Sequence, residues 1–310
     1  MNKTVAVLID YSVLNTFFLR YPEHGCVRTQ ERLGQYTSLK CGGTADFFCD
    51  VSTYEGLQKI VSFCCTNGAL LKVLGNGTDV LIKDGGVKGC VIRLTGKPFN
   101  ALEQIDERRF RIGSRVLLSE ILCRTANLGL SGMEAMSGIP ASLGGALSLN
   151  AGAYGERIAS LVESIEVMTL QGEIQQFARE QLEFQYRKGP FDNGEIILNA
   201  VLVFVPGERK KILRHALDVA LLRDYKLPHG YSAGCIFKNP SDISAGALIE
   251  KTGLKGIEHY GARISPKHGN IIINENNAHS DRILDLIALM RSQVKDRQGV
   301  DLSLEIKIWE

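Results

Sequence analysis

The sequence lacks the features that mark several common protein classes. Its 310 residues carry a formal net charge of only +2, so no strong overall field points to a nucleic acid or a membrane as partner. No apolar run approaches the roughly 20 residues that a membrane-spanning helix needs. The apolar stretch near the N-terminus is interrupted by Asp10, Tyr11 and Asn15, and no small-residue cleavage site follows it. We therefore expect a cytoplasmic protein.

Metal and disulfide signatures are also missing. None of the eight cysteines forms a CxxC pair, and the six histidines show no HExxH spacing. This argues against zinc knuckles, iron–sulfur ligation and a disulfide framework, and we expect no bound metal. Seven cysteines are predicted to be reduced and buried. The eighth, Cys235, stands in a motif that is described below.

The sequence does contain alternating helix and strand patterns, which indicate an α/β or α+β class. Its composition, 45% hydrophobic and 23% charged, is that of a globular chain, and its length suggests two to three domains or subdomains. The predicted helices cover residues 55–68, 116–128, 208–222, 244–252 and 281–297, the last capped by Ser280. The predicted strands cover residues 89–94, 109–113, 162–170, 195–205, 270–274 and 302–309.

Glycine gathers in three separate segments of the first half of the chain. These are TSLKCGGTAD (37–46), VLGNGTDVLI (73–82) and GIPASLGGALSLNAGAYG (138–155). The second is neither GxGxxG nor a P-loop, and alone it suits a tight hairpin turn as well as a ligand site. The third suits a flat or charged cofactor lying against exposed backbone, or a flexible linker. Three such turns together suggest one extended ligand, such as a dinucleotide flavin.

Further motifs follow in the second half of the chain: FQYRKG (184–189), RDYKLP (223–228), SAGCIFKNP (232–240), INENNA (273–278) and LEIKI (304–308). With the glycine segments, from about residue 33 onward, their order resembles the UDP-N-acetylenolpyruvoylglucosamine reductase family, in its shorter type without the tyrosine-loop insertion. The resemblance implies an α+β chain with a vanillyl-alcohol-oxidase/PCMH-type FAD-binding fold in two subdomains. The implied boundaries are an N-terminal extension at 1–32, an FAD-binding region at 33–206 and a substrate-binding domain at 207–310.

The family resemblance also implies a reaction. It is the reduction of UDP-N-acetylglucosamine enolpyruvate to UDP-N-acetylmuramate in peptidoglycan precursor synthesis, with non-covalent FAD and with NADPH as hydride donor. The partner is then a UDP-sugar, and no nucleic acid, membrane or obligate protein partner is implied. Two alternatives stay open, namely another flavin oxidoreductase of the same fold acting on a hydroxy acid or lactone, and a non-catalytic UDP-sugar-binding protein.

Three residues match the family's catalytic positions. Arg187 would bind the substrate carboxylate and stabilise an enolate, a task that suits a planar guanidinium, although without the motif a surface charge is the ordinary interpretation. Cys235 would donate the proton in place of the more usual Ser, since a thiol is the stronger acid. That exchange predicts sensitivity to thiol reagents, and a small buried cysteine is the alternative. Glu305 would assist proton delivery; strand alternation puts it opposite Leu304 and Ile306, where an exposed glutamate is the alternative.

The resemblance assigns binding roles to further residues. FAD contacts are expected at Gly42, Gly43, Gly75, Asn76, Gly77, Thr78, Asp79, Gly132, Gly138, Ile139, Pro140, Gly144, Gly145, Asn150, Ala151 and Gly152. Asp79 stands where Asn is usual, and Asp tolerates the same turn conformations. Substrate contacts are expected at Tyr186, Arg223, Lys226, Asn239 and His268. Residues 207–270 hold eleven Lys/Arg against six Asp/Glu, a surplus of five positive charges that suits an anionic ligand.

Overall fold

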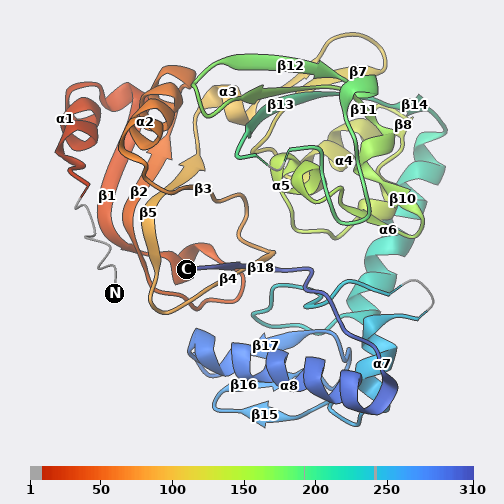
Figure 1. Cartoon of the computed structure of the whole chain (residues 1–310). Helices are drawn as coiled ribbons and strands as arrows, with labels where there is room; N and C mark the ends of the chain where they lie inside the picture. The colour runs from red at the N-terminus through yellow and green to blue at the C-terminus, as the bar shows by residue number, and fades with distance from the viewer. Residues whose placement is uncertain (1–8, 192, 241–242) are drawn as a thin grey trace.

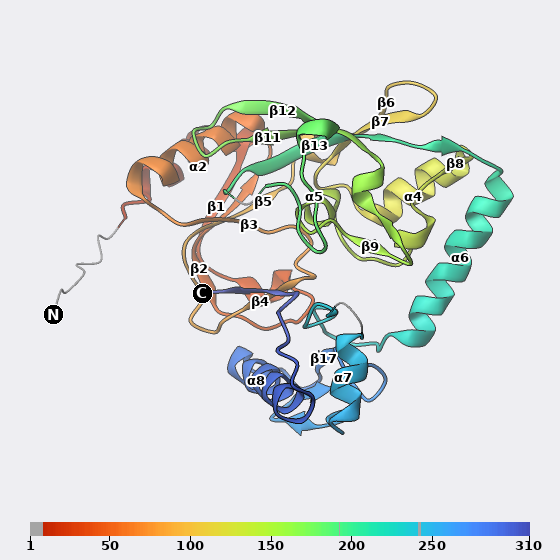
Figure 2. The ribbon, with the colours of Figure 1, turned by 45° about the vertical axis from the view of Figure 1, so that its right-hand side comes forward.

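A computed structural model describes residues 9–191, 193–240 and 243–310. Its elements form two larger sheets side by side and a smaller body of helices and short strands beneath them (Figures 1 and 2). Most strand pairs are antiparallel and helices cover the outer faces, so the α+β prediction is confirmed. Within the described residues, no helix is long and apolar enough to cross a membrane.

The first sheet is formed by the N-terminal third of the chain. Its strand order is β1 (Gly25–Arg32), β2 (Thr44–Val51), β5 (Val87–Leu94) and β3 (Leu71–Val73), antiparallel in the first pair and parallel in the others. Helices α1 (Ser12–Arg20) and α2 (Tyr54–Asn67) share its apolar core. Helix α2 begins after Thr53, whose hydroxyl accepts a hydrogen bond from the Gly56 amide, and ends at the left-handed Gly68. The prediction of a helix at 55–68 is confirmed within one residue at each end.

Strand β1 lies inside the segment that was predicted to be an N-terminal extension, residues 1–32. It pairs with β2 along its length, from Gly25 opposite Val51 to Arg32 opposite Thr44. The extension prediction is therefore wrong for this part of the chain, which belongs to the first sheet, while residues 1–8 lie outside the described residues. The strand could not be recognised from the sequence, because GCVRTQER has a single large aliphatic side chain and no apolar alternation.

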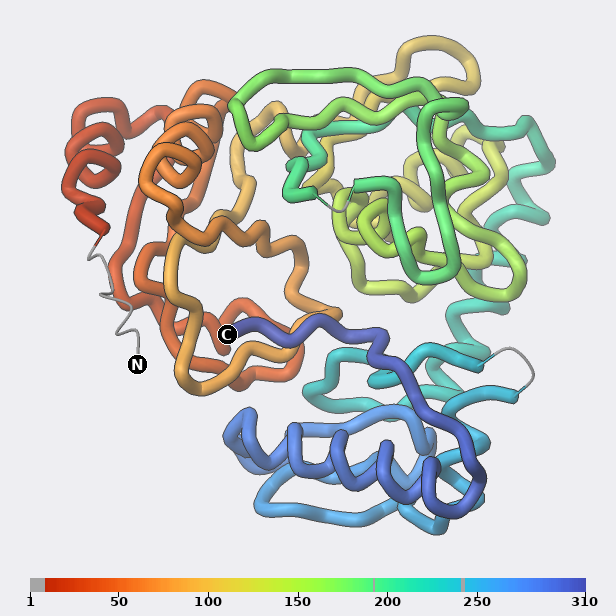
Figure 3. The backbone as a smooth tube through the Cα atoms, in the orientation of Figure 1, coloured from red at the N-terminus to blue at the C-terminus, as the bar shows by residue number. Residues whose placement is uncertain are grey.

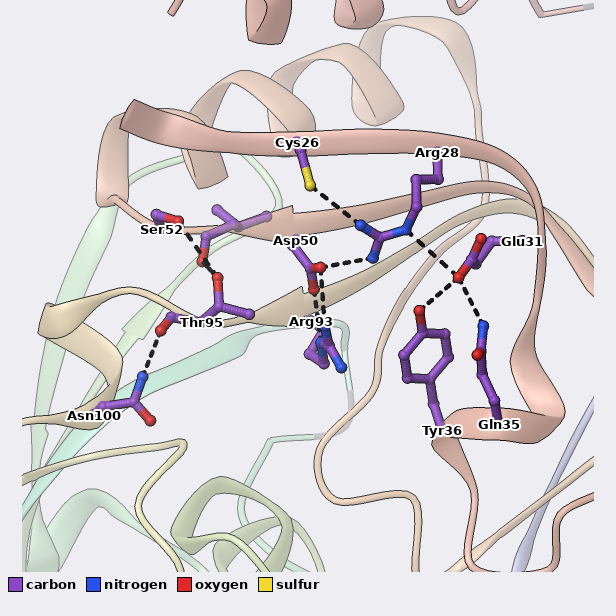
Figure 4. Close-up of polar contacts among 11 residues, drawn as sticks. Cys26, Arg28, Glu31, Gln35, Tyr36, Asp50, Ser52, Arg93, Thr95 and Asn100 are labelled. Atoms are coloured by element: carbon purple, nitrogen blue, oxygen red, sulfur yellow. Dashed lines mark hydrogen bonds and ion pairs between the residues drawn. The ribbon is translucent and has the colours of Figure 1, made fainter. Parts of the chain in front are cut away.

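One carboxylate ties three strands of this sheet together (Figure 4). Asp50 of β2 accepts hydrogen bonds from Arg28 Nη2 of β1 at 2.6 Å and from Arg93 Nε and Nη2 of β5 at 2.6 and 2.9 Å. Burial alone would raise the pKa of Asp50, but the two guanidinium groups bring it below its usual value. The carboxylate stays ionised and paired, as a half-buried charge must.

The second sheet contains the middle of the chain and is antiparallel throughout. Its order is β12 (Ile174–Ala178), β11 (Val162–Met168), β13 (Ile196–Val203), β7 (Arg109–Gly113) and β6 (Leu102–Gln104). The same region contains α3 (Lys97–Asn100), α4 (Leu118–Asn127), α5 (Leu143–Ser148) and the strand pairs β9 (Gly152–Ala153) with β10 (Glu156–Arg157) and β8 (Leu130–Ser131) with β14 (Val205–Pro206). The strand predicted at 109–113 has the observed bounds, and those predicted at 162–170 and 195–205 are slightly too long.

Helix α6 (Arg209–Lys226) leads from the second sheet to the C-terminal body (Figure 2). That body contains α7 (Ala245–Lys251), α8 (Ser280–Gln298) and a sheet of β15 (Glu258–His259), β16 (Ala262–Ile264) and β17 (Ile272–Asn274). The prediction that Ser280 caps α8 is wrong, because Asp84 from a distant loop provides the cap. Asp84 Oδ2 accepts from the Ser280 amide at 3.0 Å, and the Asp84 amide donates to the Ser280 hydroxyl at 2.8 Å. A partner so far away in sequence has no local signature.

The last residues of the chain return to the first region (Figures 1 and 3). Strand β18 (Lys307–Trp309) pairs in parallel with β4 (Val80–Ile82), so only the end of the strand predicted at 302–309 is regular. The strands on either side of the Gly75–Asp79 loop, β3 and β4, pair with β5 and β18 rather than with each other. The hairpin interpretation of that loop is therefore wrong.

The cysteines differ from the prediction in part. None of the eight is in a disulfide, and Cys41, Cys49, Cys64 and Cys90 are buried. Cys26, Cys65 and Cys123 are exposed, so the prediction of burial is wrong for these three. Cys26 lies on β1, a strand of mixed exposure, and Cys65 and Cys123 lie on exposed positions of α2 and α4.

Trp309 gives a test of whether the packing of β18 against the first region stabilises the fold. Its ring is 8% exposed and lies in a cluster with Leu33, Phe48 and Val80. We expect Trp309→Ala to lower the free energy of unfolding by about 3–5 kcal/mol in urea titrations, because it removes a large buried ring. The matched change Leu19→Ala, at a side chain that is 76% exposed, should cost under about 0.5 kcal/mol. Equal losses in the two variants would refute this role for β18.

Candidate active site

Two cavities lie where these regions meet, the larger beside the C-terminal body and the smaller between the regions of the first and second sheets. The larger has a volume of about 510 Å³ and is lined by the Thr78–Asp79 end of the glycine loop, by the 138–154 segment, by the end of α6 and by residues 232–235. The smaller, of about 100 Å³, is lined by Gly75, Ser114, Arg115 and the start of α5. Gly145 lines both, so the two cavities adjoin at this residue.

The three predicted catalytic side chains all line the larger cavity. Arg187 Nε lies 2.7 Å from Glu305 Oε1, and Arg187 Nη1 donates to the Gly152 carbonyl at 3.2 Å. Arg187 has a φ of 54°, a strained conformation outside glycine that is found disproportionately at functional sites. The ion pair fixes the guanidinium at the cavity wall.

Cys235 is held in this cavity by its neighbours in the chain. The Asn270 side chain accepts from the Phe237 amide at 3.0 Å and donates to the Phe237 carbonyl at 2.8 Å, and the Ile236 amide donates to the Asn270 carbonyl. These bonds fix the strand-like segment that carries the thiol. Glu305 is fixed beside it, because the Glu305 amide donates to the Ile236 carbonyl at 2.8 Å.

The electrostatics of the site keep the thiol protonated. Burial, and next the Glu305 carboxylate, raise the pKa of Cys235 to about 11 against the lowering effect of Arg187 and Arg223. Burial also raises the pKa of Glu305, and Arg187 opposes that rise. At neutral pH the sulfur is a proton donor, and its thiolate is scarce. The sensitivity to thiol reagents that the sequence suggested is correspondingly reduced, because the thiolate is the reactive form.

The predicted substrate residues fall into two groups. Arg223, Lys226 and His268 line the larger cavity, whereas Tyr186 and Asn239 do not. Burial lowers the pKa of His268, and its Nδ1 accepts from the Asn270 amide, so the neutral ring carries its proton on Nε2. Tyr186 and Asn239 contact each other instead, with the Asn239 amide donating to the Tyr186 hydroxyl at 3.4 Å.

The predicted cofactor residues divide in the same way. Those that line the cavities are Gly75, Thr78, Asp79, Gly138, Ile139, Pro140, Gly144, Gly145, Ala151 and Gly152. Gly42, Gly43, Asn76, Gly77, Gly132 and Asn150 do not line them. At two of these positions, close packing of the backbone requires glycine. A Cβ at Gly77 would lie 2.1 Å from the Tyr36 carbonyl oxygen, and a Cβ at Gly43 would lie 2.1 Å from the Asp84 carbonyl oxygen. Asn76 donates from Nδ2 to the Pro140 carbonyl at 2.7 Å and thereby joins two of the glycine segments.

Sequence reasoning missed two residues of the smaller cavity, Ser114 and Arg115. They follow β7 directly, within the run RIGSRV, and a Gly-Ser-Arg run at a strand end was the available signal. Arg115 is buried enough that its pKa is lowered, and no described residue accepts from its Nη1. A half-buried guanidinium whose buried Nη1 has no acceptor among the described residues favours an anion in this cavity.

Orphaned polar atoms line both cavities and give a test of whether a cofactor fits. Among the described residues, Ser114 Oγ, Arg115 Nη1, Asp79 Oδ2 and Arg223 Nε are buried without a hydrogen-bond partner. Buried polar groups are normally satisfied, so such atoms indicate that a ligand completes the site. A cation by the small cavity and apolar walls in the large one, such as Ile139 and Leu149, suit a ligand with a phosphate part and a flat ring part. The residues present therefore fit FAD.

Comparisons with known proteins decide the family. Residues 226–309 match the model of the C-terminal domain of UDP-N-acetylenolpyruvoylglucosamine reductase, and residues 45–178 match an FAD-binding-domain model. The reductase of that name from Clostridioides difficile is 38% identical over 91% of this chain and 93% of its own. The chain belongs to the UDP-N-acetylenolpyruvoylglucosamine reductase family. The reductase from Listeria monocytogenes is 34% identical over 95% of this chain and 98% of its own.

A solved structure supports the same assignment. The crystal structure of the reductase of this name from Thermus caldophilus has a TM-score of 0.79 and 35% identity, and the match covers 92% of this chain and 99% of that one. The resemblance drawn from the motifs is confirmed, and so is the FAD-binding fold that it implied. The individual site residues stay predictions that the cavity geometry supports to differing degrees.

Gly77 gives a test of the division between structural and cavity-lining glycines. Gly68 and Gly77 have similar φ values, 62° and 66°, but a Cβ at Gly68 meets nothing within 4 Å. We expect Gly68→Ala to cost about 1–2 kcal/mol, the ordinary penalty of the left-handed conformation. Gly77→Ala should cost about 1–3 kcal/mol more, because the Tyr36 carbonyl must move. Denaturant unfolding of the two flavin-free variants measures the difference, and equal stabilities would assign Gly77 to ligand contact alone.

Proposed function

We propose that this chain reduces UDP-N-acetylglucosamine enolpyruvate to UDP-N-acetylmuramate, with Arg187, Cys235 and Glu305 as its catalytic residues. The observation that carries the residue roles is their meeting in one cavity, with a cation, a protonated thiol and a carboxylate side by side. Reduction of an enolpyruvyl double bond needs a hydride at one carbon, stabilisation of charge at the next, and a proton there. The three side chains provide the last two requirements.

The cofactor is FAD and the reductant is NADPH. When bound, FAD would supply the hydride-transfer chemistry between NADPH and the enolpyruvyl carbon. Residues that would hold it are the cavity-lining members of the predicted set, with Gly75, Gly144 and Gly145 exposing their backbone in the smaller cavity. Ser114 and Arg115 are added to that set here, because their unpartnered polar atoms would receive an anionic part of the cofactor.

Arg187 is proposed to bind the substrate carboxylate and to stabilise the enolate that forms. Its guanidinium can contact a carboxylate with two parallel N–H groups, and the charge that grows on the oxygens strengthens both bonds. Its ion pair with Glu305, together with the bond from Nη1 to Gly152, sets its orientation before substrate arrives. Preorganised donors of this kind lower the barrier because they need no rearrangement.

Cys235 is proposed to protonate the carbon next to the carboxylate. Its pKa of about 11 keeps the proton on sulfur until a strongly basic carbanion or enolate appears. Glu305 borders the same cavity and raises that pKa, so it tunes the donor and can return a proton to it. The UDP part would be bound by Arg223 and Lys226 at the end of α6 and by His268, with Tyr186 and Asn239 at its margin.

Specific observations argue against the two alternative functions. A non-catalytic UDP-sugar-binding protein needs no protonated thiol facing an arginine–glutamate pair. An oxidase of hydroxy acids or lactones needs a base that accepts a proton, whereas Cys235 and its surroundings hold one. Family membership also favours the reductase over both.

The experiment separates the two half-reactions in an anaerobic stopped-flow spectrometer. Cys235→Ala should leave the bleaching of the flavin by NADPH unchanged and should slow the return of colour with the enolpyruvyl substrate by roughly 10²–10⁴-fold, because only the second step needs the proton. Cys235→Ser, which keeps a donor, should recover much of that loss. The exposed Cys123→Ala serves as the control. Equal slowing of both half-reactions in Cys235→Ala would remove Cys235 from the donor role.

A further inference from the structure

Asn270 is a buried polar residue to which the mechanism above gives no part. It is 2% exposed and directly precedes Ile271, whose backbone pairs with that of Cys235 in an antiparallel bridge. Two backbone contacts hold Asn270 in place. Its amide donates to His268 Nδ1 at 3.3 Å, and its carbonyl accepts from the Ile236 amide at 2.9 Å. The side chain therefore has a fixed position beside the segment that carries the thiol.

The carboxamide of Asn270 bonds to both polar groups of the Phe237 backbone. Oδ1 accepts from the Phe237 amide at 3.0 Å, and Nδ2 donates to the Phe237 carbonyl at 2.8 Å. Phe237 is fully buried, and buried backbone groups that lose their partners are costly. One side chain thus takes the place of a neighbouring strand here, two residues beyond the thiol of Cys235.

The same stretch of chain also bonds to the segment that carries Glu305. The Glu305 amide donates to the Ile236 carbonyl, and the Lys238 amide donates to the Ser303 carbonyl, both at 2.8 Å. The backbone on the C-terminal side of Cys235 is therefore bonded to two segments. At one of these, the bonds come from the side chain of Asn270, so a single substitution can remove them without altering the backbone of either segment.

Asn270 also acts on the donor group itself. Burial is the largest influence on the pKa of the Cys235 thiol and raises it, whereas a hydrogen bond with the Asn270 side chain acts in the opposite direction. Nδ2 carries two hydrogens, so it can donate to the Phe237 carbonyl and to the sulfur together. The carboxamide thus contacts both the donor and the backbone that carries it.

We propose that Asn270 is the positioning residue of the proton donor and holds the Cys235 thiol in place for transfer to the substrate carbon. The inference rests on the proposed function, because it needs Cys235 to be the donor. Asn270 does not line the larger cavity, so it acts through Cys235 rather than on the substrate. Proton transfer needs the donor within hydrogen-bond reach, and a displacement of about 1 Å can slow a reaction roughly a hundredfold.

Asn274, at the end of β17, provides a matched control. It is also 2% exposed, and its carboxamide forms the same kinds of bond. Nδ2 donates to the Leu39 carbonyl at 2.8 Å, and Oδ1 accepts from the Ala278 amide at 2.8 Å. Neither partner belongs to the segment that carries Cys235. An effect that comes only from the loss of two buried hydrogen bonds should therefore be alike in Asn270→Leu and Asn274→Leu.

The first test reads the backbone bonds without turnover. In hydrogen–deuterium exchange of the flavin-loaded protein, Asn270→Leu should speed exchange of the Phe237 amide on the order of tenfold, because its acceptor is lost. Asn274→Leu should instead speed exchange of the Ala278 amide and leave Phe237 as it is. Unchanged protection of the Phe237 amide in Asn270→Leu would overturn the proposal.

The second test follows reoxidation of the reduced flavin by the enolpyruvyl substrate. Asn270→Leu should slow this step by roughly tenfold to a hundredfold at saturating substrate, because the donor is displaced. The substrate concentration that gives half the maximal rate should change little, since the substrate keeps its own contacts. Asn274→Leu should stay within about twofold of the unaltered rate. Equal slowing in the two variants, or a change confined to the half-saturating concentration, would leave Asn270 with a structural role only.

Asn270→Asp provides a milder variant and a rescue. A protonated carboxyl group has one acceptor oxygen and one O–H donor, so it can form both bonds to Phe237, and burial raises its pKa. At about pH 5–6 its reoxidation rate, divided by that of the unaltered protein, should approach one, and this ratio should fall as pH rises. A low ratio that is constant with pH would contradict the proposal. The neighbouring ionisable groups, whose own titration the division cancels, are Cys235, His268, Arg187, Arg223 and Glu305.

Failure of the proposed function would look different from failure of this inference. If the enolpyruvyl substrate restores flavin colour in neither the unaltered protein nor the variants, the reaction itself is wrong, and the positioning role falls with it. If the unaltered protein, Asn274→Leu and Asn270→Leu all restore colour at similar rates, the reaction stands and the positioning role alone is refuted.

Discussion

The parallel pairing of β18 with β4 is the constraint on which the site depends. It joins the three residues of the final strand to β4, the strand that follows the glycine loop. The two strands are more than two hundred residues apart in the sequence. By this pairing the chain sets Glu305 against Arg187 of the middle region and against Cys235 of the C-terminal body. Each of the three parts thus contributes to one cavity wall, and none of them alone contains the chemistry.

The site contains buried polar groups that form no hydrogen bond with the described residues of the protein. Ser114, Arg115, Asp79 and Arg223 each have a buried polar atom without a partner among the described residues. Such atoms cost stability, by about 1–3 kcal/mol each for neutral groups, and a ligand in the cavities would complete their bonds. The cofactor and substrate then contribute to the stability of the folded chain as well as to its reaction.

Local patterns in the sequence predicted local structure well. The helix α2 and the strand β7 follow from apolar periodicity and a terminal glycine, signals that are contained in a short window. The misses are long-range: β1 has a polar pattern that only its partner strand explains, and the cap of α8 comes from Asp84. For the site, the order of the motifs led to Arg187, Cys235 and Glu305. Arg115 was missed because the lack of a hydrogen-bond acceptor for its Nη1 can be seen only in the folded structure. Gly77 and Gly43 are each required by a neighbouring backbone carbonyl, and their contacts with the cofactor stay predictions.

The most direct test of the account is product analysis by mass spectrometry. Flavin-loaded protein given NADPH and UDP-N-acetylglucosamine enolpyruvate in D₂O should yield UDP-N-acetylmuramate, with one mole of NADPH oxidised per mole of product. Deuterium should appear at the carbon next to the carboxylate, because the S–H proton of Cys235 exchanges with solvent. An unchanged substrate in the presence of fully flavin-loaded protein and NADPH would contradict the central claim.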